Sequence, residues 1–100
     1  MLTIDEIKST IKPVAQKYPI EKVILFGSYA RGDAAEASDV DIVVESGGKM
    51  QNSRIFNFSG DLLMVLPVRV DAYDMREINE LSPLYKSIKE EGVIIYESAT

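Results

Sequence analysis

Two short polar motifs, separated by ten residues, contain the side chains with the clearest chemistry. Gly27 and Ser28 follow an apolar run typical of a buried strand, and Asp39 and Asp41 open a second such run. On a strand, residues i and i+2 point to the same face, so the two carboxylates are expected to converge. Two convergent carboxylates beside a small turn that is rich in N–H groups suit a divalent metal and a phosphate.

Each motif alone also has an ordinary interpretation. A Gly-Ser pair is usually a simple turn, and an Asp-x-Asp pair is usually solvated charge at the end of a strand. The combination favours a functional site, because Asp is disfavoured in strands. Two like charges on one face of a buried strand are costly unless a cation offsets them.

Asp71 is the third candidate acid. It lies in another strand-like run, at residues 68–73, where an Asp again needs a reason. The alternative is that Asp71 only pairs with Arg69 or Arg76. Asp74 is a rival acid, but its position before a Met-Arg-Glu segment is more typical of a helix cap.

The turn at Gly27 contributes further candidates. Gly27 would let the main chain approach phosphate groups closely, and the hydroxyl of Ser28 would add a contact. The Arg31 guanidinium could meet a phosphate or an acid within the fold, and the sequence favours neither. Tyr29 could touch the nucleotide, but the turn favours its interpretation as an exposed turn residue.

Residues 25–45 resemble the signature of the nucleotidyltransferase superfamily that has a DNA polymerase β-like catalytic core. The pattern Gly-Ser-x-Ala-Arg-Gly stands at residues 27–32, and Ser-Asp-x-Asp stands at residues 38–41. In detail the chain resembles the minimal nucleotidyltransferases, the MntA-like antitoxins that are paired with HEPN-domain toxins. The likeness covers nearly the whole chain, including its ending at residues 89–97.

This resemblance implies an α/β (α+β) nucleotidyltransferase fold and transfer of AMP from ATP to a tyrosine hydroxyl of a HEPN toxin. It implies that Asp39, Asp41 and Asp71 are catalytic and bind two Mg²⁺ ions, and Asp71 is also the best candidate for the base. Gly27, Ser28 and Arg31 would then contact the nucleotide.

The composition limits the other possibilities. One hundred residues make a single domain, at 1–100, with 27% charged residues and a net charge of −5. The acidic balance argues against direct nucleic-acid binding, which needs clustered Lys and Arg. The chain has no Cys and no His, so acid–base work must use carboxylates, Lys or Tyr. It has no signal segment and no long apolar run, so we expect a soluble, cytoplasmic protein without a membrane partner.

Helices and strands alternate along the chain. The capping box at Thr3 and Glu6 predicts a first helix, which Pro13 should kink or end early. Residues 50–58 are ambiguous, and Ser59 is expected to start another helix. We expect a small mixed sheet with packed helices. Its strands are predicted at residues 22–26, 40–45, 68–73 and 93–96, and further helices at residues 28–32 and 82–91.

Three functional hypotheses follow. The first is an antitoxin enzyme that adenylylates a HEPN partner. The second is a non-catalytic antitoxin that neutralises the toxin by binding alone, which the complete acid set disfavours. The third is a small-molecule nucleotidyltransferase of the antibiotic-modifying type. It would need a separate substrate subunit, because 100 residues leave no room for an accessory domain.

Overall fold

A four-stranded mixed sheet forms the centre of the protein, in the order β3-β2-β1-β4. The computed structural model describes residues 1–99. The strands are β1 (Lys22–Phe26), β2 (Val40–Glu45), β3 (Val70–Asp74) and β4 (Val93–Glu97). β1 is antiparallel to both β2 and β4, whereas β3 is parallel to β2. The predicted mixed sheet of about four strands is therefore confirmed, with the strand that carries Asp41 in its interior.

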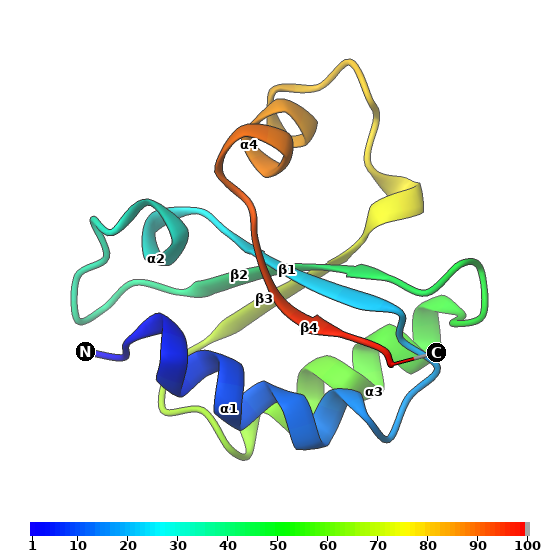
Figure 1. The fold of residues 1–100 in the computed structure, drawn as a ribbon, viewed down its shortest axis with the longest axis horizontal. Helices are drawn as coiled ribbons and strands as arrows, with labels where there is room; N and C mark the ends of the chain where they lie inside the picture. Colours follow the sequence, from blue (N-terminus) through cyan, green and yellow to red (C-terminus); the bar gives the residue numbers. More distant parts are fainter. Residues whose placement is uncertain (100) are drawn as a thin grey trace.

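Helices pack on both faces of the sheet (Figure 1). α1 (Ile4–Ala15) and α3 (Asn52–Leu63) cover one face, and α4 (Pro83–Glu91) lies on the other. Two short helices follow strands directly: α2 (Ser28–Arg31) after β1, and the 3₁₀ helix η1 (Met75–Glu77) after β3.

The two faces of the sheet have cores of different size. The larger core joins α1 and α3 to the sheet, and the smaller core contains Phe26, Val43 and Ile88. Val40, Ile42 and Val44 all belong to the larger core, so the intervening Asp41 points to the face that α4 covers. The alternation along β2 therefore brings Asp41 to the α4 face.

α1 begins as the sequence predicts. The Thr3 hydroxyl accepts a hydrogen bond from the Glu6 N–H, and the Glu6 carboxylate accepts one from the Thr3 N–H, both at 3.0 Å. Of the two effects expected of Pro13, an early end of the helix was wrong, because α1 continues to Ala15, whereas a kink stays a prediction. Pro13 lies in the last turn, where only one main-chain hydrogen bond is lost and the buried residues around it hold the helix on the sheet.

α3 begins at Asn52, well before the predicted start at Ser59. The buried residues Ile55, Phe58 and Leu62 have helical spacing, whereas Phe56 is 79% exposed. The two phenylalanines, which are spaced as on a strand, therefore point in different directions. Packing against the sheet decides this segment, since its local propensities are weak.

One end of the sheet gathers the predicted site residues. β1 ends there, and β2 and β3 begin there, because β2 is antiparallel to β1 and parallel to β3. Asp41 is registered with Phe26 on one side and with Asp71 on the other. Among the described residues, no helix is long and apolar enough to span a membrane.

Candidate active site

Asp41 and Asp71 lie side by side on neighbouring parallel strands. They are register partners in the β2–β3 pair, so both carboxylates point to the same face of the sheet. Asp39 precedes β2 directly, and its charge acts on Asp41 together with that of Asp71. The structure thus places Asp41 beside Asp71, with Asp39 near enough for its charge to act on Asp41.

Gly27 lies directly against the Asp41 carboxylate. Its φ angle is +78°, and a Cβ atom at this position would lie 2.5 Å from Oδ2 of Asp41. Only glycine adopts this conformation without strain and also leaves room for the carboxylate. The turn that begins α2 therefore packs main chain against the central acid, with Ser28 as the next residue.

Arg31 pairs with acids of the protein itself. Its Nε lies 3.2 Å from Oδ2 of Asp33, and its Nη1 lies 3.1 Å from Oε2 of Glu91 at the end of α4. Of the two roles left open by the sequence, the structure shows the internal pairing. This pairing ties α2 to α4 and so supports the turn at Gly27. Arg31 also lies near enough to Asp41 to lower its pKa.

Asp71 is also paired in this structure, since Nε of Arg69 lies 3.3 Å from its Oδ1. The Arg69 side chain is 73% exposed, so solvent screens this ion pair and it contributes little stability. The pairing leaves Asp71 available to a stronger ligand. Asp74 caps η1 by accepting a hydrogen bond from the Arg76 N–H at 3.0 Å, so its interpretation as a helix cap is confirmed.

Burial raises the pKa of Asp41 above the 3.8 of a free side chain, and the charges of Asp71 and Asp39 raise it further. Arg31 opposes this shift only in part. A carboxylate with this pKa shift is destabilised in its charged form, and a nearby cation would relieve the destabilisation. The donor set consists of hard carboxylate oxygens, which fit Mg²⁺.

The three acids do not by themselves form a finished metal cage. Within residues 1–99, no three Asp or Glu side chains are gathered closely enough to enclose an ion. Mg²⁺ is usually bound through one or two carboxylates while substrate phosphates and water complete the shell, and the ligand set of Asp39, Asp41 and Asp71 stays a prediction. Asp39 and Asp41 are the residues that would hold such an ion against a triphosphate.

The raised pKa of Asp41 predicts a pH-dependent stability. The native state binds this proton more tightly than the unfolded chain. Ionisation therefore costs stability as the pH rises from 3.8 through the raised pKa. We expect Asp41→Asn to remove this cost, so that without metal the variant melts at a higher temperature than wild type at about pH 7 and close to it at about pH 3. Calorimetry at the two pH values measures this, and an equal or lower melting temperature at pH 7 would contradict the electrostatic account.

Two features of the site carried no recognisable sequence signal. Tyr29, a residue of α2, is 4% exposed, because its side chain packs into the larger core. The expectation of an exposed turn residue was therefore wrong. Glu91 reaches Arg31 across 60 positions of sequence. Only a covariation between two positions that are distant in sequence could have indicated that pair.

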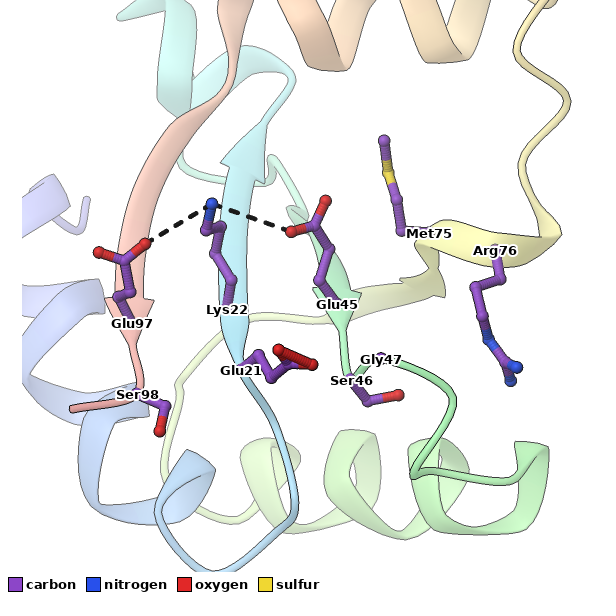
Figure 2. A pocket seen from close by; sticks show the side chains of 9 residues that line it. All are labelled: Glu21, Lys22, Glu45, Ser46, Gly47, Met75, Arg76, Glu97 and Ser98. Carbon is purple, nitrogen blue, oxygen red and sulfur yellow. Dashed lines mark ion pairs between the residues drawn. The ribbon is translucent and has the colours of Figure 1, made fainter. Parts of the chain in front are cut away.

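The cavity drawn in Figure 2, of about 510 Å³, lies at the opposite end of the sheet from the three acids. Lys22 opens β1 there and extends between Glu45 at 3.9 Å and Glu97 at 3.6 Å (Figure 2). The charges that line it largely neutralise one another. We therefore place the candidate active site at the open surface around Asp41, where like charges accumulate, and not in this cavity.

A comparison with protein families gives the context for this geometry. The family described as "Polymerase beta, Nucleotidyltransferase" matches residues 9–100. The chain belongs to this nucleotidyltransferase family. The match includes all of the strands that carry the acids, and it confirms the resemblance seen in the two motifs.

Relatives of similar length have adenylyltransferase names. A protein of Methanocaldococcus jannaschii with the provisional name protein adenylyltransferase is 35% identical over 80 residues, which is 80% of this chain and 86% of the relative. The protein adenylyltransferase MntA of Thermococcus cleftensis is 43% identical over 49 residues, or 45% of this chain and 50% of that protein.

Solved structures confirm the nucleotidyltransferase fold. A toxin–antitoxin crystal structure with AMP-PNP superimposes with a TM-score of 0.78 at 22% identity, covering 92% of this chain and 74% of that one. A chain from the complex of a tri-AMPylated Shewanella oneidensis HEPN toxin with its MNT antitoxin has a TM-score of 0.73 at 19% identity, over 96% and 74% of the two chains.

Proposed function

We propose that this nucleotidyltransferase transfers AMP from ATP to a tyrosine hydroxyl of a partner HEPN toxin and so acts as its antitoxin. The observation that carries the proposal is the contact between Gly27 and the Asp41 carboxylate, with Asp71 in register beside it. Relatives named as protein adenylyltransferases support a protein acceptor. The fold shared with a chain from a HEPN toxin complex supports the partner.

The reaction would form one phosphorus–oxygen bond and break another. The acceptor hydroxyl oxygen attacks the α-phosphorus of ATP, the bond to the β-phosphate breaks, and pyrophosphate leaves. The hydroxyl proton passes to the carboxylate of Asp71, since the chain has no His to accept it.

The protein contributes mainly position and charge, as phosphoryl-type transfer requires. Mg²⁺ would supply charge neutralisation for the triphosphate and for the leaving group. Asp39 and Asp41 would hold the ion, with Asp71 as the ligand nearest to the acceptor. The open main chain at Gly27 would lie along the phosphates, with the Ser28 hydroxyl beside it.

Mass spectrometry tests the transfer directly. We expect a mixture of this protein, Mg²⁺, ATP and the purified HEPN toxin to give toxin heavier by one or more AMP groups, with the modified tyrosine found by peptide mapping. Omission of ATP or Mg²⁺ should abolish the gain. An unmodified toxin that is nevertheless neutralised would show that binding alone is sufficient.

A thermal shift experiment tests the metal ligands without using the reaction. Ligands that bind only the native state stabilise it by about 2.7 kcal/mol at a hundredfold excess over Kd. Mg²⁺ with a non-hydrolysable ATP analogue should therefore raise the melting temperature of the wild-type protein, and should raise that of Asp39→Asn clearly less. An equal rise in both proteins would remove Asp39 from the ligand set.

A further inference from the structure

β3, the strand that carries Asp71, lies at the edge of the sheet. Its register with β2, and the hydrogen bond from the Val40 N–H to the Arg69 carbonyl at 2.9 Å, fix which of its main-chain groups face β2. Because these groups alternate along a strand, the N–H and C=O groups of Val70, Ala72 and Asp74 point away from the sheet. Within residues 1–99, Val70 and Ala72 make no main-chain hydrogen bond outside the sheet, whereas the carbonyl of Asp74 begins the 3₁₀ helix η1.

A groove of about 430 Å³ runs beside the second half of this edge. Ala72 and Tyr73 of β3 form one side of it, and Ile55, Ile78 and Leu84 supply apolar lining from α3, the segment after η1 and α4. The charged groups along it are both acidic, Asp74 and Glu77. Asp74 is engaged by Arg76 at 3.4 Å, whereas Glu77 is exposed.

We propose that this edge binds the acceptor polypeptide itself, as an extended segment that pairs with β3 and becomes a fifth strand. This inference rests on the proposed transfer to a protein hydroxyl and names the form in which the acceptor is bound. The outward main-chain groups of Val70 and Ala72 match the main chain of an extended polypeptide. The exposed carboxylate of Glu77 favours a segment with basic residues.

Strand pairing would also aim the acceptor. A residue of the bound segment that lies directly opposite Asp71 places its side chain on the face to which Asp71 and Asp41 point. Its Cβ atom would lie about 4.5–5.5 Å from the Cβ atom of Asp71. A hydroxyl-bearing side chain at that position would reach the acids. Residues further along the segment would contact the apolar lining and Glu77.

Peptide binding tests the pairing. The probe is a fluorescein-labelled, end-blocked peptide with the sequence Arg-Val-Lys-Val-Tyr-Val-Lys, and anisotropy gives its Kd. Two forms of this peptide with methylated main-chain nitrogens serve as matched controls for each other. The first is methylated at Tyr and at every second residue from it, and the second is methylated at the residues in between. Only one set of N–H groups can face β3, so we expect one form to bind at least about tenfold more weakly than the other.

Variants of the protein test the same edge. Ala72→Pro removes an outward N–H but no bond to β2 and should weaken binding of the unmethylated peptide, with circular dichroism to verify folding. Glu77→Lys reverses a charge in the groove and should weaken binding several-fold. Glu80→Lys makes the same change on the same segment outside the groove and should leave the Kd unchanged. If Ala72→Pro does not fold, the Kd of the peptide for Glu77→Lys, compared with that for Glu80→Lys, tests whether the peptide binds along this edge.

The results separate this inference from the proposed function. Equal binding of the two methylated forms, or a Kd for the unmethylated peptide weaker than about 1 mM, overturns the strand pairing. Transfer of labelled AMP to both methylated forms with equal KM overturns it too, while the transferase function stands. Binding that depends on the methylation pattern, without transfer to any peptide or toxin, supports the pairing and removes the proposed function.

Discussion

Asp41→Asn is expected to lower the rate of AMP transfer by about 10²-fold or more, the scale of losing one preorganised electrostatic group at a reacting centre. Asn keeps nearly the same volume but lacks the charge that would hold a metal ion against the triphosphate. Asp41 lies at the centre of the candidate site, between Gly27 and Asp71. The measurement is single-turnover transfer to the HEPN toxin with excess enzyme.

Asp5→Asn provides the matched control. Asp5 is exposed in the first turn of α1, away from the face that carries Asp41, and this variant should retain wild-type transfer. Asp41→Asn should still bind the toxin, because neither volume nor fold changes. If Asp41→Asn neutralises the toxin as well as wild type and adds no AMP, the protein acts by binding alone and our catalytic assignment is wrong.

Gly27→Ala is expected to reduce transfer by a similar factor, about 10²-fold, for a geometric reason. The new Cβ would meet Oδ2 of Asp41 at 2.5 Å, so the carboxylate or the turn must move. Displacements of about 1 Å at a reacting centre can cost 10²-fold in rate. The alanine would also be strained at a φ angle of +78°.

Gly32→Ala is a control that places an alanine at a positive φ angle without a collision. Gly32 has a φ angle of +86°, but a Cβ atom there would meet nothing within 4 Å. Gly27→Ala should lose more stability in urea denaturation, because the ψ angle of −155° at Gly27 is essentially restricted to glycine, whereas Gly32 lies in the left-handed region at a ψ angle of 13°. Only Gly27→Ala should lose most of its transfer activity. Equal activity losses would mean that the contact with Asp41 is not what makes Gly27 necessary.

The sequence by itself determined the elements whose signals are local. The first strand, at residues 22–26, and the second, at residues 40–45, were predicted with the bounds that the structure has, because both are short apolar runs bounded by turn residues or by charge. The capping box at Thr3 was predicted because its two hydrogen bonds join residues three apart. The two motifs indicated Asp39 and Asp41 as candidate acids, and their resemblance to a known signature indicated the nucleotidyltransferase family.

Elements with weak local signals were decided by packing. The start of α3 was predicted too late, since residues 52–58 mix polar and aromatic side chains and become helical where Ile55 and Phe58 are buried on the sheet. The third strand, expected at residues 68–73, is β3 at Val70–Asp74, because its bounds follow from pairing with β2. Burial of Tyr29 likewise depends on the core beneath α2.

Only the tertiary structure decided how the site residues meet. Asp41 and Asp71 are register partners although 30 positions separate them, and Arg31 finds Glu91 across 60 positions. The sequence indicated a carboxylate pair and a glycine turn, but not that the turn packs against one of those carboxylates. Contacts of this kind join segments that are brought together only by strand order and chain direction, and no periodicity within one segment encodes them.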